Sequence, residues 1–173
     1  AVQVDKFERA ESVALLARHG GLTAPDADAV ASHLGDLPIS LAQAAAWASE
    51  TGQPVSEYLH LFNAELERRH ISDSLGYPRT AAAAMSIAFN QLRAGSAHAA
   101  QLLQLASYFG PEWISLDLLH RGRLATPLSR RLSKTLRDQA PLERAVKDIA
   151  RWELARNDTR NLRFQIHRLV QRM

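Results

Sequence analysis

The chain has 173 residues, 46% of them apolar, which is enough to fill the core of one large domain or two small ones. It contains no cysteine, so disulfide frameworks, thiolate zinc sites and thiol catalysis are excluded. The net charge of +3 conceals an asymmetry: residues 120–172 hold 14 Lys or Arg against 5 Asp or Glu, or +9, and the remainder is −6. We therefore expect two modules with different surfaces.

The first forty residues predict the end of a strand and then two helices. Val2 and Val4 alternate with polar neighbours, as in the last residues of a strand. Apolar residues recur at helical spacing over residues 7–17 and predict the first helix. Thr23 is a suitable cap for a second, short helix, which we expect Gly35 to stop.

The next two helices differ in how much of their surface is apolar. The third is expected over Ile39 to Glu50, begins after Pro38, and is apolar on almost every side, which is typical of a buried helix. Pro54 opens the fourth, whose apolar stripe is the clearest amphipathic signal in the chain. We expect its charged residues, including Glu65, to lie on a solvated face.

The remaining elements change from helical to alternating periodicity. Two helices are predicted, one beginning at Tyr77-Pro78 and one capped by Ser96, before Gly110-Pro111 interrupts the pattern. Three shorter helices follow, and their ranges are 116–119, 128–136 and 142–149. Apolar and charged residues then alternate on both sides of a turn at residues 157–160, which predicts a β-hairpin.

Three short helices followed by a hairpin are the order of a winged-helix module. The expected fold is therefore mainly α, with a helical bundle at residues 1–111 and a winged-helix domain with a C-terminal β-hairpin at residues 112–173. The apolar stretches are too short to span a bilayer, so we expect no membrane contact. The absence of cysteine is what a reducing compartment permits, so the expected location is the cytoplasm.

Motifs for catalysis are absent from the sequence. It has no glycine-rich phosphate-binding loop followed by lysine and Ser or Thr, no nucleophile elbow and no metalloprotease motif. The seven histidines are scattered, without the pairs at helical spacing that would hold one metal ion. We therefore expect no enzyme activity and no metal site in this chain.

Two segments resemble motifs of one family. The segment from Gly35 to Ala45, with Leu37 and Pro38 at its start, resembles the Gly-Leu-Pro-Leu segment of the NB-ARC (STAND) nucleotide-switch ATPases. Ile166-His167-Arg168 follows the predicted hairpin, where that family places its Met-His-Asp motif on a winged-helix subdomain. Arg168 stands where the family has aspartate, so the role of that aspartate does not carry over to this chain.

The order of these features over nearly the whole chain is similar to that of bacterial NB-ARC proteins that carry tetratricopeptide repeats. The resemblance implies a fragment that comprises the helical and winged-helix ARC subdomains of an ADP/ATP-dependent signalling switch. The parent would be a slow ATPase switch. Its P-loop domain would precede this chain, and its repeat domain would follow.

The resemblance also implies where nucleotide would be contacted. Pro38 would lie against the adenine of ADP and His167 would reach the β-phosphate, and the implied cofactor-binding residues are Leu37, Pro38, His167 and Arg168. No bound cofactor is expected for the fragment by itself. The implied partners are the two neighbouring domains of the same chain, and activation would allow homo-oligomers to form.

Two other functions stay open. The basic C-terminal part would suit a winged-helix DNA-binding protein with a helical dimerisation domain, which would read DNA through residues 142–152 and Arg160. That helix mixes Arg144 and Lys147 with Glu143 and Asp148, so we do not expect nucleic acid to be a partner. A helical interaction scaffold without nucleotide is the third alternative.

Overall fold

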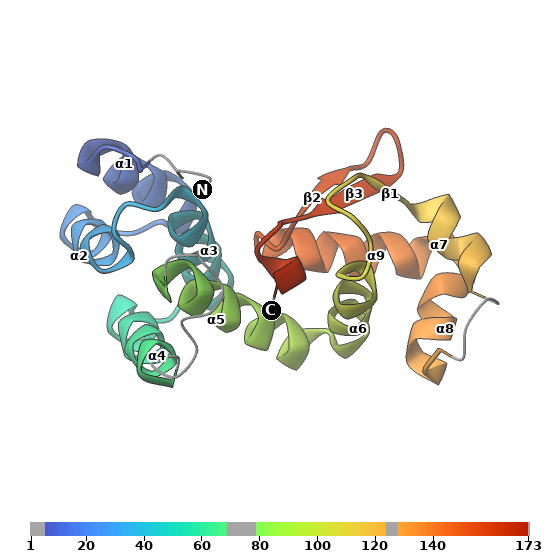
Figure 1. Ribbon diagram of the computed structural model, residues 1–173. Helices are drawn as coiled ribbons and strands as arrows, with labels where there is room; N and C mark the ends of the chain where they lie inside the picture. The colour runs from blue at the N-terminus through green and yellow to red at the C-terminus, as the bar shows by residue number, and fades with distance from the viewer. Residues whose placement is uncertain (1–5, 69–78, 124–127, 173) are drawn as a thin grey trace. The chain divides into compact units, whose positions relative to one another are not determined.

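A computed structural model describes residues 6–68, 79–123 and 128–172 of the chain. In these ranges it contains nine α-helices, three short strands and a closing turn of 3₁₀ helix, which confirms the expected mainly α fold class (Figure 1). The fold divides into two compact units between Ala88 and Phe89. The predicted strand at Val2 and Val4 and the predicted helix start at Tyr77-Pro78 lie outside the described residues.

The first unit consists of helices at the positions that the sequence predicts. They are α1 (Arg9–Gly20), α2 (Ala24–Leu34), α3 (Pro38–Thr51), α4 (Val55–Arg68) and the first part of α5 (Arg79–Gly95). The Thr23 hydroxyl accepts a hydrogen bond from the Asp26 amide at 3.4 Å, as expected of the residue that caps α2.

Helix α3 is the centre of the first unit, because α1, α2 and α4 all pack on it. Its Trp47 ring lies 5.3 Å from the ring of Tyr58 in α4, and Tyr58 stacks at 6.2 Å on Phe62. All three rings are fully buried. The all-round apolar pattern of α3 therefore indicated its burial correctly.

The expectation that Glu65 is solvated is wrong. Its side chain is only 8% exposed, and its carboxylate forms an ion pair with Arg68 at 3.0 Å. Glu65 lies one turn beyond Phe62 on α4, so it belongs to the buried side of the helix although its charge is paired at the edge. Helical periodicity places Glu65 on the buried face of α4, but the prediction gave more weight to its charge.

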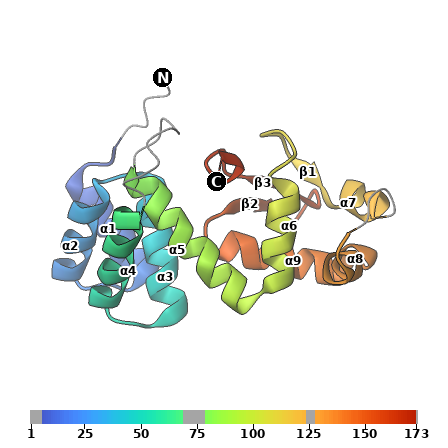
Figure 2. The ribbon, with the colours of Figure 1, turned by 60° about the horizontal axis from the view of Figure 1, so that its bottom comes forward.

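The second unit is a winged helix. Its elements after α5 are α6 (Ala97–Ala106), β1 (Ile114–Ser115), α7 (Leu116–Gly122), α8 (Arg130–Arg137), α9 (Gln139–Arg151), β2 (Ala155–Asp158) and β3 (Arg163–Ile166). The antiparallel sheet has the order β1-β3-β2, so the short strand before the helices pairs with the last strand of the hairpin. Helix α9 packs against β2, and α6 crosses α9 (Figure 2).

The hairpin differs from the prediction by two residues. Trp152 caps the C-terminus of α9 instead of opening a strand, and the turn lies at residues 159–162. The Asp158 carboxylate closes this turn, because it accepts hydrogen bonds from the Asn161 amide at 3.2 Å and from Arg163 Nε at 2.9 Å. Strand β1 was not predicted, since two residues are too few to show a period.

Helix α6 packs on α8 and α9, so it belongs by contact to the winged-helix unit. The sequence-based boundary after residue 111 describes subdomains of the resembled family and stays a prediction. In the structure the 17 residues of α5 run across the point where the two compact units divide.

Candidate functional site

The turn that carries Leu37 and Pro38 joins α2 to α3 in the first unit. Gly35 ends α2 in the left-handed conformation with φ 65°, and Asp36 follows with φ 57°. The Asp36 amide donates to the Ala31 carbonyl at 3.2 Å, which completes the C-terminal cap of α2. Leu37 then occupies the N-cap of α3, and Pro38 is its first residue.

Positive φ at Asp36 is uncommon for a residue other than glycine and marks a strained backbone. A clamp from α1 holds it in place. Arg9 donates through Nε to Asp36 Oδ1 and through Nη2 to Oδ2, both at 2.9 Å, and through Nη1 to Asp28 Oδ1 at 3.2 Å. The Phe7 amide also donates to the Asp36 carbonyl at 3.0 Å.

This clamp stabilises the charged form of the Asp36 carboxylate. The two hydrogen bonds from Arg9 hold the pKa of Asp36 below its usual range, so this carboxylate stays ionised in more acidic solution than an ordinary aspartate. Sequence reasoning missed the pair, because Arg9 and Asp36 are 27 positions apart and belong to no common motif.

Leu37 and Pro38 have different environments in the turn. The Leu37 side chain is 5% exposed and contributes to the core, whereas Pro38 is half-buried. Of the two, Pro38 is the one with surface available for contact with another group. The predicted cofactor contacts of both residues stay predictions.

His167 is the first residue after β3 in the second unit, and backbone groups hold it on several sides. Its amide donates to the Leu154 carbonyl at 3.2 Å, and its carbonyl accepts from the Val170 amide at 2.8 Å. The ring nitrogen Nδ1 accepts a hydrogen bond from the Leu169 amide at 3.3 Å. Because Nδ1 is an acceptor, the neutral ring carries its proton on Nε2.

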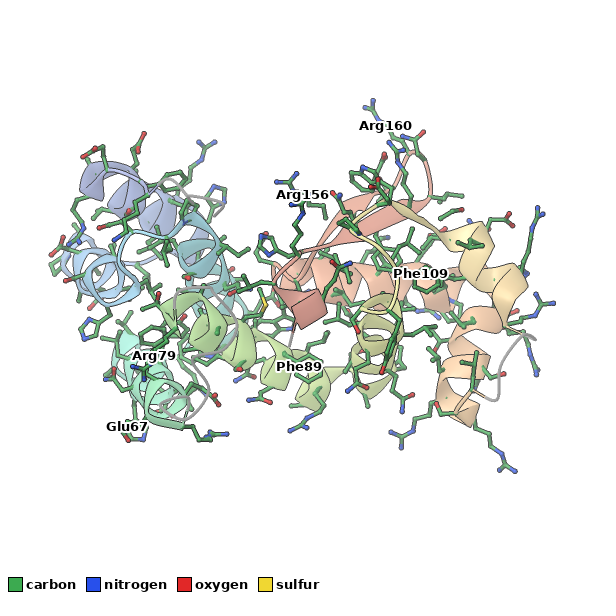
Figure 3. All side chains as sticks on the ribbon, in the orientation of Figure 1. Glu67, Arg79, Phe89, Phe109, Arg156 and Arg160 are labelled. Atoms are coloured by element: carbon green, nitrogen blue, oxygen red, sulfur yellow. The ribbon has the colours of Figure 1, made fainter. Side chains whose placement is uncertain are left out.

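The surroundings of His167 favour this neutral form. Burial lowers the pKa of the imidazole, and the positive charge of Arg156 on β2 lowers it further. Arg156 and Arg168 are both exposed, and Figure 3 shows Arg156 projecting from the hairpin. In the described part of the chain no hydrogen bond occupies Nε2. The ring therefore offers an N–H donor next to cationic side chains.

The four residues that the sequence singled out thus form two local sites. Leu37 and Pro38 lie in the first unit, while His167 and Arg168 lie in the second, and each pair is described within its own unit. Among the described residues, no group of three or more His, Asp or Glu side chains is placed to hold a metal ion. None of the described helices is both long enough and apolar enough to cross a membrane.

Comparison with known proteins yields one family match. Residues 88–173 match the model of a family described as a domain of unknown function (DUF7779), and this range coincides with the winged-helix unit. No curated protein and no solved structure matches the chain.

Proposed function

We propose that this chain is the regulatory helical and winged-helix part of an ADP/ATP-dependent signalling switch. In this proposal it closes over a nucleotide bound by a P-loop domain elsewhere in a longer parent protein. The observation that carries the proposal is His167 at the end of β3, whose ring accepts one hydrogen bond from the Leu169 amide and presents Nε2–H beside Arg156. The resemblance of this segment to the Met-His-Asp motif connects that geometry to a phosphate.

The chemistry of the His167 site suits a phosphate group. A neutral imidazole donates one hydrogen bond through Nε2, and Arg156 and Arg168 add positive charge that attracts an anion. An approaching phosphate favours the imidazolium, so the ring gains a proton and the hydrogen bond becomes charge-assisted. The arginine at position 168 strengthens this attraction where an aspartate would weaken it.

Such a site supplies what a two-state switch requires. A ligand shifts an equilibrium between two conformations only as far as it binds one of them more tightly. In the closed state His167 donates to the β-phosphate of ADP, and in the open state this contact is lost. ADP therefore holds the protein in the closed, inactive conformation.

In the first unit, the turn at Pro38 supplies the second nucleotide contact of this proposal. Pro38 lies against the adenine ring. Leu37 is buried, so it supports Pro38 from the core instead of offering an exposed surface to the ring. The chain itself performs no catalysis. The partners in this proposal are the P-loop domain and a repeat domain of the same cytoplasmic protein, and the active state forms homo-oligomers.

The test is the rate at which the parent protein releases fluorescent ADP. We expect His167→Ala to release ADP about tenfold faster than the wild type, the effect of losing roughly one charge-assisted hydrogen bond. The matched control is His60→Ala, which removes an exposed histidine on α4. Release that is unchanged in His167→Ala, or accelerated equally in His60→Ala, contradicts the proposal.

A further inference from the structure

Helix α8 has a basic face that the nucleotide proposal does not use. All four charged residues of this helix are cationic and exposed, and they are Arg130, Arg131, Lys134 and Arg137. The opposite side of the helix is buried, and its residues are Leu132, Thr135 and Leu136. The helix therefore separates its charge from its core contacts completely.

The cations of α8 form a row along the helix. Arg130, Lys134 and Arg137 follow one another at spacings of four and three residues, which places them on one side of an α-helix. The row rises by about 10 Å from first to last. One strand of duplex DNA carries a phosphate about every 3.4 Å along the axis, so about three phosphates lie beside such a row.

These charges are free to meet an external anion. None of the four makes an ion pair with a described residue, whereas Arg121 on α7 is paired with Asp117 at 2.8 Å. The start of the helix is fixed, because the Ser129 hydroxyl accepts from the Leu132 amide at 3.2 Å and donates to Gln101 Oε1 at 2.9 Å. The cations thus project from a positioned helix.

The face of α8 also lacks what a protein partner requires. Protein interfaces depend on a few buried aromatic or aliphatic anchors. The large apolar side chains that are exposed in the described part of the chain all lie on other elements, and they are Tyr108, Trp113, Leu118 and Leu162. A phosphate backbone requires only positive charge at suitable spacing.

Helix α9 is less suitable for this contact. Its exposed Arg144 and Lys147 stand beside the half-buried carboxylates of Glu143 and Asp148, which reduce the local positive potential. The sequence placed any nucleic-acid contact on α9 and discounted it for this reason. The structure instead shows on α8 a row of exposed cations with no carboxylate within the helix itself, where Asp138 follows only at its C-cap.

We propose that the exposed face of α8 binds the sugar–phosphate backbone of nucleic acid, without reading the base sequence. This function is independent of the proposed nucleotide switch. The contacts are ionic, so the affinity falls as salt displaces them.

The test measures binding of the chain to a fluorescent 20-base-pair DNA duplex by anisotropy, at several salt concentrations between 50 and 200 mM. The variant replaces all four cations of α8 by glutamine, as R130Q/R131Q/K134Q/R137Q. The matched control replaces four exposed cations on other helices, as R18Q/R93Q/R144Q/K147Q, and so has the same net charge.

We expect the wild type to bind with an affinity that declines steeply with salt. The α8 variant should lose about 2.7 to 3.6 units from the slope of log affinity against log salt, since three to four phosphate contacts are lost and each contributes about 0.9. The control should keep most of the slope. Circular dichroism checks that both variants keep their helices, and the single reversal Lys134→Glu repeats the test with minimal change to the chain.

Three results would overturn the proposal. One is the absence of salt-dependent binding by the wild type at 50 mM salt. Another is an equal or larger loss in the control, which would assign binding to general charge or to α9. The third is that vesicles rich in phosphatidylserine compete for the α8 face at equal phosphate concentration, which would identify a lipid surface as its partner.

Discussion

The two units hold their candidate residues by different physical means. In the first unit the turn at Pro38 depends on an ion pair at the surface, because the exposed Arg9 clamps a strained, partly buried Asp36. In the second unit His167 is held by hydrogen bonds to backbone groups at the end of a sheet. The first arrangement responds to charge and salt, whereas the second is determined by the fold itself.

The largest expected effect on stability comes from truncating a core side chain in the unit that carries each site. Phe164 on β3 and Trp47 on α3 are both essentially unexposed. We expect Phe164→Ala and Trp47→Ala each to cost about 3–5 kcal/mol, through lost burial and the cavity left behind. Urea unfolding followed by circular dichroism measures the cost, and amide exchange shows which unit is affected.

The control for these two variants is Leu118→Ala, which truncates a side chain that is 53% exposed. We expect it to change the stability by less than about 0.5 kcal/mol. If Phe164→Ala instead increased amide exchange in the first unit as strongly as in its own, the division of the fold into two units would be incorrect.

An intermediate effect is expected from the strained turn. Both Asp36→Ala and Asp36→Gly remove one of the two carboxylate partners of Arg9, but only glycine adopts positive φ without strain. We therefore expect Asp36→Gly to be more stable than Asp36→Ala by about 1 kcal/mol. Thermal unfolding of the two variants tests this order.

The exchange rate of the Phe7 amide, which donates to the Asp36 carbonyl, reports on the clamp itself. It should rise in Arg9→Ala and rise with salt in the wild type, because both weaken an ion pair at the surface. Equal stability of the glycine and alanine variants would show that the positive φ at Asp36 carries no strain.

The smallest effect is a pH dependence in the second unit. The pKa of His167 is lower in the folded protein than in the unfolded chain, so the unfolded chain takes up a proton first as the pH falls. The contribution of the neutral ring is complete above about pH 6.5 and is lost progressively as the pH falls from there toward the folded pKa. Unfolding of the second unit between pH 8 and 5 should show this loss.

The pH dependence should be absent in His167→Gln, which cannot be protonated in this range. The first unit responds at lower pH. The depressed pKa of Asp36 means that its contribution is present above about pH 4 and is lost as the pH falls through the folded value. A loss of stability near pH 6 that persists in His167→Gln would assign the titration to another group.

Much of the fold was predictable from local sequence. Thr23 and Gly35 bound α2, and Pro38 opens α3, because caps, left-handed glycines and N-terminal prolines act within one helical turn. The all-round apolar pattern of α3 and the alternation around the hairpin have the same local origin. The winged-helix order followed from counting these elements.

What the sequence by itself determined is therefore the set of helices, the hairpin and the separation of charge between the two parts of the chain. Only the tertiary structure decided that Arg9 clamps Asp36, that β1 pairs with β3, and that the four cations of α8, a helix without carboxylates, all lie on its exposed side. It also made Nδ1 of His167 an acceptor and left Nε2–H as its donor. Each of these features joins residues that are distant in the sequence or depends on the burial of one side chain. Local periodicity does not show which distant residues come into contact, nor how deeply a single side chain is buried.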